Sequence, residues 1–214
     1  MKKAKKILVM VAALALTAAI AVGGTLAYLT AKTSVVTNTF TVGNVAITLD
    51  EAPVDVYGDV VAGDRTTANS YKLIPGHSYT KDPTVHVAVG SEQCWLFVKV
   101  ENGLVKTIEG KEVNIEAVHS EEAEHKYDTI AEQMTKNGWV ALTDEEGVYA
   151  YNGIVDARTA AVDKIVFGEF AIGGEADVSA YAQQTITVQA YAVQADGFDT
   201  YDEAWDSAPL TDWQ

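Results

Sequence analysis

Short segments in which apolar and polar residues alternate recur about every ten residues along much of the chain, with turn residues between them. Alternation with a period of two is typical of a β-strand, because successive side chains point to opposite faces. Residues 84–90 show it clearly, since Val85, Val87 and Val89 share one face. Helical segments that could connect parallel strands are too few. The pattern therefore predicts an all-β fold, an antiparallel β-sandwich of jelly-roll or immunoglobulin-like type with one or two short peripheral helices.

One segment, residues 93–101, is apolar on both faces, with Leu96 and Val98 on one side and Phe97 on the other. A strand covered on both faces is expected near the middle of a sheet. Residues 184–195 form a second long alternating segment. The predicted core residues come from three strands: Val85, Val87, Leu96, Val98, Ile186 and Val188.

Turn residues divide the rest of the chain. Asn102-Gly103 predicts a hairpin after the central strand, and Pro75-Gly76 predicts a type II turn after residues 71–74. Residues 51–70 are acidic and loop-like, with only 54–57 resembling a short strand, so we expect an excursion at the sheet edge. Further strands are expected at 104–108, 113–118, 139–143, 147–152 and 163–172.

Two segments favour short helices. Between residues 120 and 137, Ile130 and Met134 recur at helical spacing, and Gly138 provides a stop. In the tail, Thr200 and Glu203 have the spacing of a capping box. We expect the tail helix to dock on the sandwich through Trp205.

The first residues of the chain have the pattern of an export signal. Lys2, Lys3, Lys5 and Lys6 precede an apolar run over residues 7–22. A membrane anchor is the alternative, but sixteen residues fall short of the roughly twenty that span a bilayer as a helix. The small residues before the bond predict cleavage after Ala27, or one or two residues later, at Tyr28 or Leu29.

The alternation changes parity shortly after this leader. Val36, Phe40 and Val42 share one parity, whereas Val45, Ile47 and Leu49 share the other. A change of parity at Gly43-Asn44 requires a bulge or a two-residue turn, and this dipeptide suits both. We therefore expect four parts: a signal peptide over 1–28, an N-terminal strand over 29–43, a sandwich domain over 44–197, and a C-terminal helix and tail over 198–214.

The net charge of the chain limits the classes of partner that we expect. The chain carries a net charge of −15, and removal of a leader with four lysines and no acidic residue takes it to −19. Such a surface repels nucleic acid and anionic lipid, so we expect no nucleic-acid partner and membrane contact only through the uncleaved leader. About 185 remaining residues suffice for one domain with a core. A single cysteine, Cys94, permits no intrachain disulfide.

Patterns that carry catalytic chemistry are missing from the sequence. His119 and His125 lie near Glu121 in an acidic run, but their spacing does not place both imidazoles on one helical face, and no H-E-x-x-H motif occurs. Cys94 lies among apolar strand residues, where burial makes a thiol inert. We also find no nucleophile elbow and no phosphate-binding glycine loop. The expectation is a protein that is not an enzyme and has neither metal nor cofactor.

The N-terminal stretch AVGGTLAYLTAKTSVVTNTFTVGNVAITLDE, residues 21–51, resembles the leader and first strands of the TasA and camelysin family of secreted Firmicute proteins. Residues 73–101 are similar to the family's L-x-P-G and K-x-P-x-V-x-V core, although Val89-Gly90-Ser91-Glu92 stands where the family often has Asn-Gly. The tail resembles the family's Q-A-D-G-F-D-T and E-A-W ending.

This resemblance implies a function. It suggests export to the cell surface of a Gram-positive bacterium, cleavage by a SipW-type signal peptidase, and assembly into extracellular biofilm-matrix fibres. In such a fibre the strand carrying Val36, Phe40 and Val42 would complete the sheet of the next subunit, and other matrix proteins could also bind. Two alternatives remain open: a monomeric surface or adhesion module whose first strand joins its own sheet, and a camelysin-like metalloprotease.

Overall fold

The computed structural model describes residues 44–116 and 128–207. Several predictions lie outside these residues. They are the leader with its cleavage site, the strand over 29–43, the histidines at 119 and 125, and the last residues of the tail.

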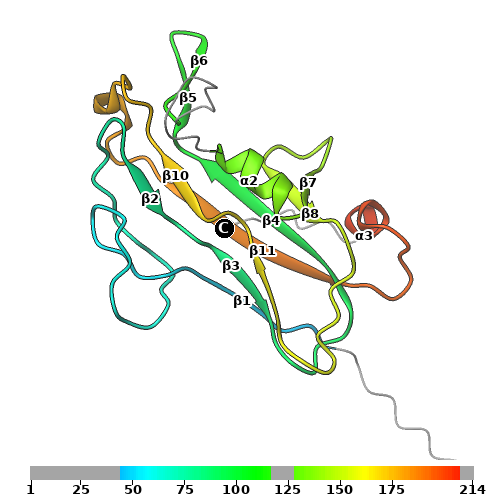
Figure 1. The fold of residues 1–214 in the computed structure, drawn as a ribbon. Helices are drawn as coiled ribbons and strands as arrows, with labels where there is room; N and C mark the ends of the chain where they lie inside the picture. Colours follow the sequence, from blue (N-terminus) through cyan, green and yellow to red (C-terminus); the bar gives the residue numbers. More distant parts are fainter. Residues whose placement is uncertain (1–43, 117–127, 208–214) are drawn as a thin grey trace, which may run out of the picture. The chain divides into compact units, whose positions relative to one another are not determined.

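The first sheet has three antiparallel strands in the order β1-β3-β9, of which β1 and β3 are labelled in Figure 1. A shorter pair, β2 and β10, continues β3 and β9, because Val166 N donates to Pro83 O and Lys81 N donates to Gly168 O between the two ladders. The predicted strand over 163–172 is therefore two strands separated by a bend. The bounds are β1 (Ile47–Asp50), β2 (Ser78–Thr80), β3 (Thr84–Val87), β9 (Val162–Ile165) and β10 (Glu169–Ala171).

The second sheet has four antiparallel strands in the order β11-β4-β8-β7. Its members are β4 (Cys94–Asn102), β7 (Trp139–Ala141), β8 (Val148–Tyr151) and β11 (Ile186–Gln194). β4 pairs with β11 along its whole length and with β8 on its other side. The prediction of a central strand is confirmed, and the fold is the expected all-β sandwich of antiparallel sheets.

The main core lies between the two sheets. Val85 and Val87 of β3 and Leu96 and Val98 of β4 are buried there. The rings of Tyr79 and Phe170 stack with centroids 4.8 Å apart. Ile186 and Val188 of β11, predicted as core residues, are only half-buried.

A second apolar cluster covers the outer face of β4. Helix α3 (Tyr201–Ser207) packs there, with the ring of Trp205 5.0 Å from that of Phe97. Thr200 Oγ1 accepts a hydrogen bond from Glu203 N, as the sequence predicts, and Glu203 Oε2 accepts from Asp199 N. Docking of the tail through Trp205 is confirmed.

The other helices are short. α2 (Ile130–Lys136) begins at a capping box between Thr129 and Glu132 and is followed by Gly138 with a φ of 88°. It buries Ile130 and Met134. A 3-10 turn, η1 (Val178–Tyr181), precedes β11. In the described part of the chain, no helix is both long and apolar enough to cross a bilayer.

The hairpin prediction at Asn102-Gly103 is wrong. β5 (Val105–Ile108) pairs with β6 (Lys111–Asn114), not with β4, and this hairpin projects from the sandwich (Figure 1). Both edges of β4 are already occupied by β11 and β8, so the chain turns away after Asn102. Asn102 Oδ1 instead accepts a hydrogen bond from Leu104 N.

Two smaller differences concern the loops. β3 ends at Val87, and Val89, predicted to face the core, is 62% exposed beside the turn at Gly90. Residues 54–57 form no strand and contribute only a bridge between Val54 and Val60. The turn at Pro75-Gly76 is confirmed, because His77 N donates to Ile74 O and Gly76 has a φ of 76°.

Candidate functional site

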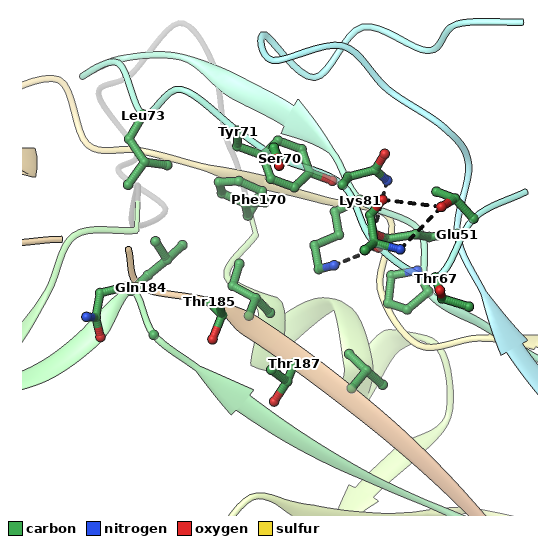
Figure 2. Close-up of a pocket in the computed structure, with 18 of the residues that line it drawn as sticks. Glu51, Thr67, Ser70, Tyr71, Leu73, Lys81, Phe170, Gln184, Thr185 and Thr187 are labelled. Carbon is green, nitrogen blue, oxygen red and sulfur yellow. Dashed lines mark hydrogen bonds and ion pairs between the residues drawn. The ribbon is translucent and has the colours of Figure 1, made fainter. Parts of the chain in front are cut away.

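A large groove opens along one side of the sandwich, between the edge strand of each sheet. It has a volume of about 1220 Å³ and is bounded by the end of β1 and the first half of β11. Figure 2 shows Thr185 and Thr187 on the β11 side, with Tyr71, Phe170 and Lys81 across from them. Residues 66–70 and 182–185 also line it.

Along this groove β11 presents an open backbone edge. Gly103 N donates to Thr185 O and Ala195 N donates to Gln93 O, so odd-numbered residues of β11 face β4 in the antiparallel ladder. The N–H and C=O groups of the even-numbered residues therefore point away from β4. These residues are Ile186, Val188, Ala190, Ala192 and Gln194, and no hydrogen bond joins their outward backbone groups to any other described residue.

β1 has an open edge as well. Ala88 N donates to Ala46 O, so even-numbered residues of β1 bond to β3 and the backbone groups of Ile47 and Leu49 point away from it. Within residues 44–116 and 128–207, these outward groups have no hydrogen-bond partner. The edge is blocked at Glu51, which exchanges two backbone hydrogen bonds of 2.8 Å with Thr66. Three open residues, Val45, Ile47 and Leu49, therefore precede a stop.

The groove lining includes apolar side chains that are incompletely covered. Leu49 of β1, Leu73, and Ile186 and Val188 of β11 are each half-buried against the core. By contrast, the β4 residues that face the same core are fully buried. Apolar surface left in contact with water carries a free-energy cost that a bound apolar segment would remove. Ile186 and Val188 are half-buried because they line this groove.

The lining also carries polar side chains, and among them is a buried ion pair. Lys81 Nζ lies 2.6 Å from Glu51 Oε2, and both side chains are about nine-tenths buried. Asn69 Nδ2 donates to Glu51 Oε1 at 3.0 Å and to Ala52 O at 2.8 Å (Figure 2). Buried charges are tolerated when they are paired and hydrogen-bonded, and this pair meets that requirement.

An arginine holds the loop that carries this cluster. Arg65 forms ion pairs with Asp50 and with Asp82, the latter at 2.9 Å, and its guanidinium also donates to Thr84 Oγ1. These contacts join the loop over 51–70 to the ends of β1 and β3. These charge-assisted hydrogen bonds therefore fix the part of the groove lining formed by residues 66–70.

Tyr71 lies across the groove from β11. Its ring packs edge-on against Phe170 with centroids 5.2 Å apart, and its hydroxyl donates to Thr80 O. Burial raises the pKa of Tyr71 well above its ordinary value, and the nearby charge of Glu51 raises the pKa further. The phenol therefore stays protonated and serves as a hydrogen-bond donor in the wall.

The chemistry of the groove suits binding. Among the described residues, no group of three or more histidine, cysteine or acidic side chains is placed to hold a metal ion. Cys94 is fully buried, and burial raises its pKa to about 11, so the thiol is inert as predicted. The volume exceeds the roughly 300–1,000 Å³ typical of small-molecule pockets. Apolar walls beside an open strand edge match an extended polypeptide.

Sequence reasoning located only part of this site. Val36, Phe40 and Val42, expected to enter a groove, lie outside the described residues, as do Ala27, Tyr28 and Leu29. Ile186 and Val188 were predicted as core and line the groove instead. The sequence gives no signal for Lys81 and Glu51, because a pair separated by thirty residues is brought together only by the sheet.

Comparison with protein-family models, with curated proteins and with solved structures gives no match for this chain.

Proposed function

We propose that this protein is a secreted structural subunit of extracellular fibres of a biofilm matrix, and that its groove receives residues 29–42 of another copy. The observation that carries the proposal is the groove itself, a partly apolar channel flanked by two strand edges whose outward backbone groups have no hydrogen-bond partner among the described residues. Addition of a strand to an open edge supplies main-chain hydrogen bonds, and its alternate side chains fill the channel.

The chain contains a segment suited to this groove. Residues 29–42 alternate in polarity and place Val36, Phe40 and Val42 on one parity. Fourteen residues extend about 46 Å as a strand, compared with about 30 Å for the nine residues of β11. The resemblance of residues 21–51 to the TasA and camelysin family favours the same assignment.

The location of this segment favours a filament. It directly precedes β1 in the chain, so a copy that donates it also carries a groove of its own. A contact between two different surfaces of identical subunits leaves one of each surface free at the ends of the assembly. Unless the rotation between subunits closes a ring, such a contact propagates into a filament. Removal of the leader would release the segment from the membrane and permit assembly.

A monomeric surface module is the second candidate, and the suitability of Gly43-Asn44 for a two-residue turn favours it. A two-residue turn there would return residues 29–42 antiparallel to β1 of the same copy. Both candidates use the same groove and differ in whose segment fills it.

Electron microscopy of the processed protein with and without residues 29–38 separates the two. For a fibre subunit, we expect filaments from the intact protein and none from the truncated one, which keeps a cooperative melting transition. A synthetic peptide of residues 29–42 should stop filament growth by filling the terminal groove. Filaments of normal length from the truncated protein would exclude strand donation. Monomers throughout, with unfolding on truncation, would favour the surface module.

A further inference from the structure

We propose that the strand entering the groove pairs antiparallel with β1 in a single register, and that the buried Lys81–Glu51 pair sets this register by binding the side-chain amide of Asn38. In this register Val42 lies opposite Val45, Phe40 opposite Ile47 and Asn38 opposite Leu49. The inference rests on the proposed function, because it concerns how the same groove recognises its strand.

The register follows from the open backbone of β1. A two-residue turn at Gly43-Asn44 pairs residue 42 with 45, and then 40 with 47 and 38 with 49. Residues 45, 47 and 49 are those whose backbone groups point away from β3. The ladder cannot continue to Glu51, since Thr66 already occupies that edge. Exchange of the strand between copies keeps these contacts, because domain swapping preserves the interface of the closed form.

This register also decides which side chains face inward. Residues directly opposite each other in an antiparallel pair point to the same face. Val45, Ile47 and Leu49 pack against the core, whereas the residues between them are exposed. Within residues 36–42, the incoming residues with the same orientation are Val36, Asn38, Phe40 and Val42. Asn38 is the polar member of this set and needs a partner inside the groove.

The structure offers that partner at the matching position. Glu51 follows Leu49 by two residues and so lies on the same face, diagonal to the residue opposite Leu49. Lys81 Nζ carries three N–H donors, and among described residues only Glu51 accepts one of them. A side-chain amide can accept from the ammonium group and donate to the carboxylate. A buried polar contact of this kind specifies register, as a single asparagine does in coiled coils.

Peptide binding to the full chain tests the inference. The probe is a fluorescent peptide of residues 29–42, and its affinity is measured by anisotropy. We expect Asn38→Leu in the peptide to weaken binding about tenfold or more, because it leaves the Lys81 donors unsatisfied. Thr39→Leu is the matched control, since residue 39 has the opposite parity, and it should change the affinity less than about threefold.

A change in the protein should reverse this preference. Lys81→Met alone leaves Glu51 buried with its charge unpaired, so the test uses the pair Lys81→Met with Glu51→Leu, which replaces both charges by apolar groups. This variant should bind the Asn38→Leu peptide more tightly than the original peptide. Equal losses from Asn38→Leu in both proteins would overturn the register while leaving strand insertion intact.

If the chain's own segment fills the groove and excludes the peptide, the same substitutions are combined within the chain. The effect of Asn38→Leu on the midpoint of urea unfolding should then depend on the background. The substitution should lower the midpoint of the original chain and leave that of the Lys81→Met, Glu51→Leu variant unchanged. Additive shifts would overturn the register. Failure of the peptide to bind, together with no effect of Phe40→Ser on the midpoint, would instead contradict the proposed function.

Discussion

His86 connects three strands on the outer face of the first sheet. Its Nε2 lies 2.9 Å from Asp50 Oδ1 of β1, and its Nδ1 lies 2.7 Å from Asp163 Oδ1 of β9. Burial opposes a charge on the imidazole, but the hydrogen bonds to Asp163 and Asp50 outweigh it and raise the pKa of His86. Because Asp50 belongs to β1, this contact also supports one wall of the groove.

The raised pKa of His86 predicts a dependence of stability on pH. The group stabilises the fold fully below the unfolded-state pKa of about 6.5, and the contribution is lost as pH rises through the higher folded-state pKa. The free energy of unfolding should therefore fall between about pH 6 and pH 8. Urea titrations of the original chain and of His86→Asn measure it, and the difference between them should shrink across this range. A constant difference would contradict the prediction.

Leu96 lies at the centre of the main core and is 1% exposed. Leu96→Ala should lower the free energy of unfolding by about 2 to 5 kcal/mol, because the surrounding side chains fill the resulting cavity only partly. Ile154→Ala is a suitable control, since Ile154 is 46% exposed, and should change it by less than about 0.5 kcal/mol. Denaturant unfolding measures both. A loss below about 0.5 kcal/mol for Leu96→Ala would show that β4 is not the central strand.

At the scale of the strand, the two open edges can be distinguished with proline. Proline lacks a backbone N–H, so at an edge it stops pairing on the side where that N–H points. The N–H of Ile47 points away from β3, and that of Ala190 points away from β4. Neither substitution removes a hydrogen bond within the existing sheets.

We expect Ile47→Pro to abolish filaments and Ala190→Pro to permit them, because the entering strand pairs with β1. Ile47→Ala controls for the lost side chain and should weaken assembly without abolishing it. Electron microscopy reads filament formation, and circular dichroism checks that each variant is folded. The opposite result, with filaments from Ile47→Pro and none from Ala190→Pro, would place the entering strand on β11.

The chain carries a net charge of −15, or −19 without the predicted leader, so subunits of the proposed fibre would repel one another. Salt screens this repulsion over about 10 Å at 0.1 M ionic strength. Filament growth should therefore accelerate several-fold between about 0.02 M and 0.2 M sodium chloride. Light scattering follows the rate, and sucrose at matched osmolarity provides a control without ionic screening. Slower growth with added salt would indicate that attraction between charges drives assembly.

The sequence alone determined the fold class and several elements. The central position of β4 followed from apolar residues on both faces of residues 93–101, because a strand that must be covered on both faces is expected in the middle of a sheet, and here the main core covers one face and the α3 cluster the other. The helix at Tyr201–Ser207 followed from the local spacing of Thr200 and Glu203. These features depend on residues close together in the chain, so their pattern is visible without a structure.

Tertiary structure decided what local patterns leave open. Asn102-Gly103 has the chemistry of a hairpin turn, yet β5 pairs elsewhere because β11 and β8 already occupy both edges of β4. Alternation placed Ile186 and Val188 on the inward face of β11. It could not show that the facing sheet ends at β1, so that these two side chains are only half covered. Lys81 and Glu51 meet only because β1 and the β2–β3 segment lie side by side. Pairing partners and open edges depend on contacts between distant residues, so a periodic pattern along one segment cannot specify them.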